Sequence, residues 1–124
     1  MPALPAQGQS RVPSQDYFRD VTALAEVLGK SHAFRVVCNG RNDLYWRSYM
    51  LRLLDLEAPS QGGVRRSLVN GFTAGFSIGS DLHPICDGNA VNAEKAYAAE
   101  GRDLSARLVQ SNIPGANPMP RDPR

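Results

Sequence analysis

Four apolar segments of helical spacing, separated by short runs of glycine, proline and asparagine, constrain this chain more than any other feature. Within each segment apolar residues recur three and four positions apart, which is the spacing of one face of an α-helix. The breaks fall at Asn39 and Gly40, at Pro59 and at Pro84. Glycine favours a helix end and proline cannot continue a helix, so the pattern predicts four helices joined by short turns.

Three of the four segments also have a residue suited to cap their start. Ser14 can cap the first helix, Asn42 the second, and Asp87 or Asn89 the fourth, because their side-chain oxygens accept bonds from unpaired helix N–H groups. The stripes that this spacing predicts for the four segments are Tyr17, Val21, Leu24, Leu28, Ser31 and Arg35, widened by Phe18, Ala25 and His32; Trp46, Tyr49, Met50, Leu53 and Leu54, with Leu56 at the rim; Val64, Leu68, Phe72, Phe76 and Leu82; and Ala90, Ala93, Tyr97, Gly101, Leu104 and Leu108.

These segments predict an all-α protein, a four-helix up-down-up-down bundle. Short connections make successive helices antiparallel neighbours, and the many glycines favour oblique crossings over strict heptad packing. We expect Gly75 and Gly101 to mark a close approach of the third and fourth helices, because both lie among small residues.

The ends of the chain differ in composition from its centre. Prolines, glycine and polar residues dominate 1–13 and 112–124, which predicts a flexible leader, a helical domain over 14–111 and a Pro-rich flexible tail. No apolar run approaches the roughly 20 residues of a membrane span. The first 13 residues lack the basic and apolar regions of an export signal, so they fit either a cytosolic start or a mature secreted chain.

Two cysteines lie 48 positions apart. In the predicted bundle Cys38, at the end of the first helix, and Cys86, just past the end of the third, meet at one pole, so a disulfide joining the ends of helices 1 and 3 is sterically reasonable. The alternative is a metal site that adds His32 and His83. That alternative is disfavoured because the chain lacks the tight pair of cysteines found in most structural zinc sites.

The charged residues argue against binding to nucleic acid. The formal net charge is only +2, and the arginines are spread along the chain instead of forming a basic patch. Several have acidic residues three or four positions away, as Arg47 has in Asp43, which is typical of a solvated helix face.

Four stretches resemble a known family: LGKSHAFRVVC at 28–38, YWRSYMLRLLDLEAP at 45–59, LVNGFTAGF at 68–76 and AAEGRDLSARL at 98–108. In this order they look like a family of small secreted alphaproteobacterial proteins of unknown function, and the likeness covers nearly all of 17–111. The chain has Thr73 and Phe76 where the family motif has Asn and Tyr. The resemblance implies an export signal, two well-separated cysteines joined by a disulfide, and a periplasmic mature protein.

Function is less specified than fold. The leading hypothesis is a non-enzymatic interaction module that binds an envelope or cell-wall partner through Arg35, Trp46 and Arg47, with His32 as a further candidate, although a helical Trp is more often core. The alternative is a periplasmic protein that binds a metal or small ligand through His32, His83 or Glu57, or in a cavity that glycine-lined helices can leave between them. We predict no catalytic residues and no cofactor, because no nucleophile with a base and no cofactor motif is recognisable.

Overall fold

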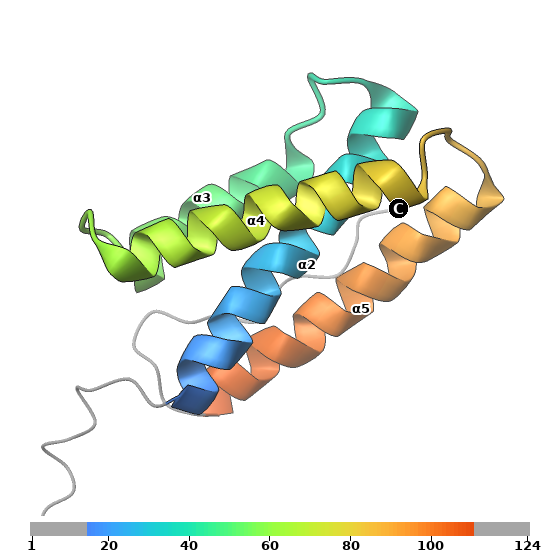
Figure 1. The fold of residues 1–124 in the computed structure, drawn as a ribbon. Helices are drawn as coiled ribbons and strands as arrows, with labels where there is room; N and C mark the ends of the chain where they lie inside the picture. The colour runs from blue at the N-terminus through green and yellow to red at the C-terminus, as the bar shows by residue number, and fades with distance from the viewer. Residues whose placement is uncertain (1–14, 111–124) are drawn as a thin grey trace, which may run out of the picture.

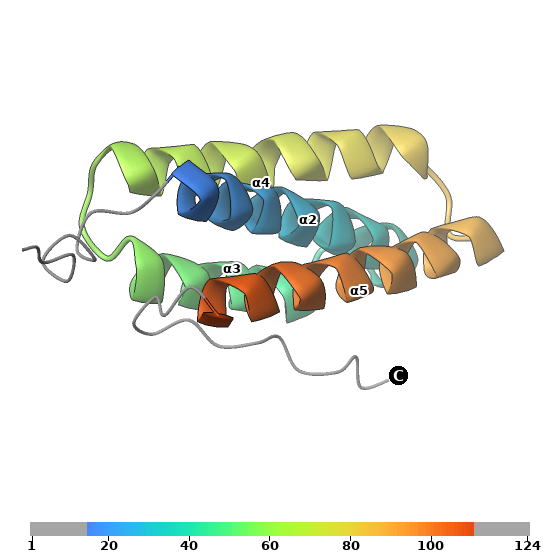
Figure 2. The same cartoon turned by 90° about the horizontal axis from the view of Figure 1, so that it is seen from below.

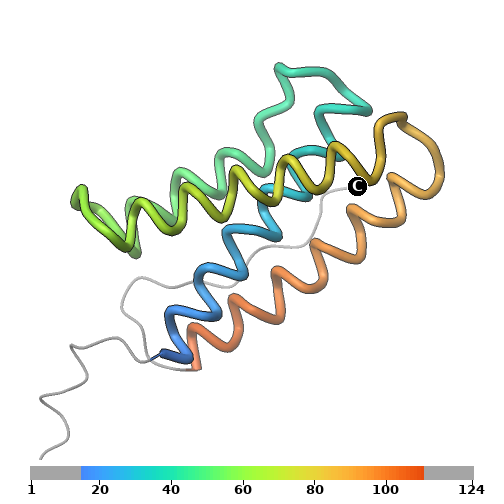
Figure 3. Tube along the Cα trace, viewed as in Figure 1, coloured from blue at the N-terminus to red at the C-terminus, as the bar shows by residue number. Residues whose placement is uncertain are grey.

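The computed structural model describes residues 15–110, and these form four α-helices and no strand. The helices are α2 (Gln15–Asn39), α3 (Tyr45–Glu57), α4 (Gly63–Leu82) and α5 (Gly88–Gln110). Each runs antiparallel to the one before it, with short connections between them (Figure 3). The predicted all-α, up-down-up-down arrangement is therefore confirmed. The leader, the tail and the Ser14 cap lie outside the described residues.

The first helix of the bundle, α2, is its centre. It contacts α3, α4 and α5, whereas no Cα atom of α4 comes within 8 Å of one in α5. Figure 1 shows α5 running alongside α2 while α4 crosses it obliquely, and Figure 2 shows α2 between α4 on one side and α3 and α5 on the other. The buried face of α2 is correspondingly wide, and residues 27–29 and 31–34 are all buried.

Glycines let α4 lie directly on α2. An added Cβ on Gly75 would sit 2.1 Å from the carbonyl oxygen of Glu26, and one on Gly29 would sit 2.1 Å from the carbonyl oxygen of Phe72. No side chain fits at either position, so the two backbones touch. The predicted approach of Gly75 to Gly101 is wrong. Gly101 is buried in α5, and the partner of the α4 glycines is α2, whose own small residues accept them.

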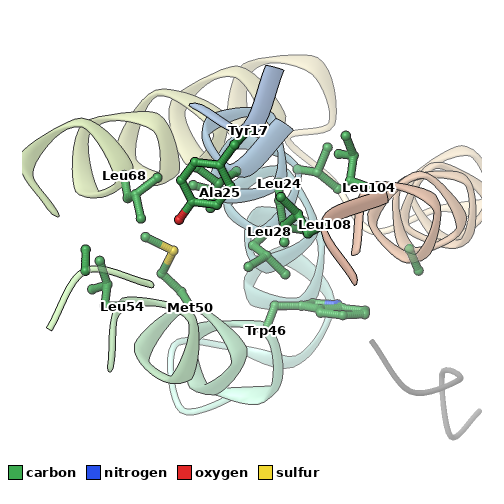
Figure 4. Close-up of a cluster of buried hydrophobic side chains, with 14 residues drawn as sticks. Tyr17, Leu24, Ala25, Leu28, Trp46, Met50, Leu54, Leu68, Leu104 and Leu108 are labelled. Carbon is green, nitrogen blue, oxygen red and sulfur yellow. The ribbon is translucent and has the colours of Figure 1, made fainter. Parts of the chain in front are cut away.

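The apolar core gathers around α2 (Figure 4). Side chains from all four helices converge there, and the fully or almost fully buried ones labelled in the figure are Tyr17, Leu24, Ala25, Leu28, Trp46, Met50, Leu54, Leu68, Leu104 and Leu108. The predicted stripes are largely right. Leu82 is an exception, since it is 58 % exposed in the last turn of α4, beyond the glycines that approach α2.

The helix ends follow the predicted breaks, with one different cap. α2 ends at Asn39 before Gly40, whose φ of 95° suits glycine. At the start of α3 it is Asp43, not Asn42, that accepts the backbone N–H of Tyr45, at 3.1 Å. At the start of α5, Oδ1 of Asp87 accepts a hydrogen bond from the backbone N–H of Ala90 at 2.9 Å, which confirms one of the two predicted caps.

A disulfide joins Cys38 to Cys86. Cys38 lies in the last turn of α2, as predicted, but Cys86 lies in the loop between α4 and α5, two residues before α5 starts. The bond therefore ties the first helix to the start of the fourth and not to the third. The loop between α4 and α5 spans residues 83–87, and Cys86 lies near its end, closer in sequence to α5 than to α4. The bond also rules out the alternative Cys2His2 metal site, because neither sulfur is a free thiolate.

Candidate functional site

Trp46, the first candidate for recognition, belongs to the core. Its side chain is 0 % exposed, and its indole N–H donates a hydrogen bond to Oε2 of Glu94 on α5 at 2.7 Å. Burying the indole removes a large apolar area from water, and the bond satisfies its only polar atom. Trp46 thus joins α3 to α5 and offers no surface to a partner.

Arg35 is also internal. Its guanidinium donates from Nε to both oxygens of Asp43, at 3.0 and 2.9 Å, and its NH1 lies 3.4 Å from Oε2 of Glu94. It stacks over the ring of Tyr45, 4.6 Å from the centroid. Its side chain is 14 % exposed. The hypothesis that Arg35 is an exposed binding residue is therefore not supported by its position, because its side chain is largely enclosed and its Nε and NH1 groups already have partners.

These groups form one polar network under the α2–α3 turn. Burial alone would raise the pKa of Asp43, but hydrogen bonds from Asn39, from the Tyr45 N–H and from Arg35 lower it below its usual range. Burial alone would lower the pKa of Arg35, but Asp43 and then Glu94 raise it. Both groups stay charged at neutral pH, so the network fixes α3 and α5 against the end of α2.

His32 lies below a different surface. It is 8 % exposed, and its ring centroid lies 5.7 Å from that of Phe72 and 5.4 Å from that of Phe76. Burial lowers the pKa of His32, the charge of Arg47 lowers it further, and Asp43 opposes them. The imidazole is therefore neutral at neutral pH.

One nitrogen of this ring, Nδ1, is enclosed by the protein and has no hydrogen-bond partner. Buried polar atoms are nearly always paired, because an unpaired one loses its bonds to water without replacement. An unpaired nitrogen in the core next to a surface opening is a feature that stability alone does not account for. It directs attention to the opening itself.

That opening, the His32 hollow, is lined by His32, Arg47, Phe72, Thr73 and Phe76 and has a volume of about 240 Å³. Its lining comes from α2, α3 and α4. The close α2–α4 contact sets its shape, because Phe72 and Phe76 flank the glycines that touch α2. Arg47 is exposed and forms no ion pair with any other residue of 15–110.

The structure thus separates the four predicted binding residues into two groups. His32 and Arg47 meet at the hollow, while Trp46 and Arg35 lie in the interior. Sequence reasoning assigned Phe72 and Phe76 to the core stripe and overlooked them as lining. The available signal was their spacing of four beside Gly71 and Gly75, which places two rings on the edge of a glycine face.

Glu57 and His83, the other ligand candidates, do not line the His32 hollow. Glu57 Oε1 accepts the hydroxyl of Tyr17 at 2.8 Å, while its Oε2 is buried without a partner. Burial raises the pKa of Glu57, although the bond from Tyr17 opposes this. His83 meets the ring of Phe34 edge-on at 4.9 Å. Within 15–110 no three His, Cys, Asp or Glu residues gather as a metal site would require.

A larger depression of about 500 Å³ lies where the start of α2 meets the end of α5. Its charged residues pair with one another: Arg19 with Asp16 at 2.8 Å and Arg107 with Asp20 at 3.4 Å. Exposed pairs of this kind contribute little and leave no unpaired charge to attract a ligand. The His32 hollow is the better candidate site.

The fold and site define a class: a small helical domain closed by one disulfide, with an aromatic hollow beside its central helix. Residues 16–111 match the family described as a protein of unknown function (DUF2385), and the chain belongs to that family. No curated protein and no solved structure matches the chain significantly. Within the described part of the chain, no helix is long and apolar enough to cross a membrane.

Proposed function

We propose that this protein is a non-enzymatic binding module of the bacterial periplasm that engages an envelope or cell-wall partner through the His32 hollow. The observation that carries the proposal is an opening walled by the rings of His32, Phe72 and Phe76 and lined also by Arg47, a cation with no ion pair to another residue of 15–110. Binding sites combine apolar walls with a few polar groups in this way.

The disulfide supports the proposed compartment. Disulfides persist in the periplasm and outside cells and are rare in the cytosol, where thiols are kept reduced. The likeness to secreted proteins of unknown function points the same way. Trapping the thiols in living cells by acid quenching and alkylation tests this: we expect Cys38 and Cys86 to be oxidised, and two alkylated thiols would contradict a periplasmic location.

The binding surface is tested by site-specific crosslinking in cells. A photoreactive amino acid replaces Thr73, which is exposed at the hollow, and in a matched control it replaces Glu100, which is exposed on α5. We expect a discrete crosslinked species from position 73 and not from position 100, with equal melting temperatures for both proteins. Equal or absent crosslinking at the two positions would overturn the proposed surface.

A further inference from the structure

The size of the His32 hollow limits its ligand. An engineered apolar cavity of about 150 Å³ takes one benzene, and pockets for drug-sized molecules start at about 300 Å³. A volume of about 240 Å³ lies between these. It accommodates one aromatic ring or short aliphatic chain with a small polar group attached.

The walls favour a flat or apolar body. Phe72 and Phe76 present rings on one side, and the ring of His32 lies against both of them. A second ring inserted here would bury apolar surface and gain the edge and offset contacts that aromatic groups prefer. Because Nδ1 of His32 is enclosed, a ligand meets this residue through its ring face or through Nε2.

The charges favour an acid over a base. Arg47 lines the hollow, and no acidic residue does. The acidic group that acts on His32, Asp43, is already bonded to Arg35, Asn39 and the Tyr45 N–H. Guanidinium groups bind carboxylates with two parallel hydrogen bonds.

We propose that the hollow binds a carboxylate carried on a short aromatic or aliphatic group, with Arg47 holding the acid and Phe72 and Phe76 holding the apolar part. This assignment rests on the proposed function, because it names the ligand of the same surface. The chemistry is shared by a small free acid and by an apolar residue at the C-terminus of a peptide.

Two pairs of probes separate these sources. The first pair is 3-phenylpropionate and its amide; the second is an acetylated tetrapeptide ending in phenylalanine with a free or an amidated C-terminus. Binding is followed by NMR on the aromatic side chains, with His83 as an internal reference because it lies outside the hollow. We expect the acids to shift the resonances of His32, Phe72 and Phe76 and the amides to bind at least about tenfold more weakly.

The acid also has a signature that a merely apolar contact lacks. Arg47 and burial disfavour the charged imidazole of His32, and Asp43 favours it. A bound carboxylate adds a negative charge beside the ring, so it should raise the measured pKa of His32, whereas the amide should leave this pKa unchanged. A rise with both probes, or with neither, contradicts the assignment.

Variants identify the cation. Arg47→Gln should weaken binding of the acids about tenfold and remove their advantage over the amides, while Arg52→Gln, an exposed arginine on the same helix, should not. Binding of amides as tightly as acids, or equal effects of the two variants, would overturn the assignment. If crosslinking at position 73 still finds a partner, only the ligand class has failed; if that crosslink is missing too, the proposed function has failed with it.

Discussion

The close contact between α2 and α4 predicts that alanine at two glycines of α4, Gly75 and Gly71, has opposite effects on the stability of the protein. In Gly75→Ala the new Cβ would lie 2.1 Å from the backbone oxygen of Glu26, and the helices must separate by about 1 Å to restore an ordinary contact. Because a backbone atom cannot rotate away, we expect a cost near the upper end of overpacking, about 3 kcal/mol. Alanine returns about 1 kcal/mol in helix propensity. The net loss of about 2 kcal/mol should lower the melting temperature by about 8–16 °C.

Gly71→Ala is the matched control. Its Cβ would lie 3.4 Å from the nearest atom, the carbonyl oxygen of Thr22, so it fits without movement and should leave stability unchanged or raise it by up to about 1 kcal/mol. Thermal and urea unfolding of both variants, monitored by circular dichroism, supply the comparison. If Gly75→Ala melts at or above the temperature of Gly71→Ala, the two backbones do not touch and the packing described for α2 and α4 is incorrect.

Three further perturbations test the core and its polar groups. Reducing the disulfide, or replacing both cysteines by serine, should cost about 4 kcal/mol in the chain-entropy model, measured as a lower urea midpoint; an unchanged midpoint would contradict a native bond. Trp46→Ala should cost about 3–5 kcal/mol, and the wild-type fluorescence should be blue-shifted and resist iodide, whereas a red-shifted, readily quenched spectrum would place Trp46 at the surface. The raised pKa of Glu57 means that the native state holds the proton of this carboxyl more tightly than the unfolded chain does, so the free energy of unfolding should fall as pH rises from about 4.5 through the raised pKa. Glu57→Gln should remove this fall. Parallel pH profiles of stability for the two proteins would contradict the assignment to Glu57.

Local pattern was sufficient for the helices and most of the core. Apolar spacing and the breaks at Gly40, Pro59 and Pro84 located four helices, and the order of the helices brought Cys38 and Cys86 together. These features depend on neighbours within a few positions or on the general course of the chain. The capping residue of α3 could not be predicted from local sequence, because Asp43 accepts a hydrogen bond from the distant Arg35 as well as from the backbone N–H of Tyr45.

Contacts between distant residues could not be predicted in the same way. Gly75 belongs to a smooth face whether that face meets α2 or α5, and only the tertiary arrangement selects α2. Trp46 and Glu94 are 48 positions apart, and nothing in either segment identifies the other as its partner. Arg35 was predicted to bind a partner, but its own side-chain partners, Asp43 and Glu94, lie eight and 59 positions away in the sequence.

The His32 hollow depends both on residues that local sequence could single out and on a contact between distant residues that it could not. His32 and Arg47 were predicted as binding candidates from residue type, but the hollow exists only because α4 lies close enough to α2 to bring Phe72 and Phe76 beside His32. Its position therefore depends on the glycine contact more than on any motif. A variant that separates the helices should alter the hollow as well as the stability.

The most direct measurement of the central claim is crosslinking from position 73 in cells that carry a second substitution at the rim. In the Arg47→Gln background we expect the crosslinked species to be strongly reduced, and in the Arg52→Gln background we expect it to be retained, because only Arg47 lines the hollow. Equal crosslinking in the two backgrounds would show that the partner does not engage the His32 hollow.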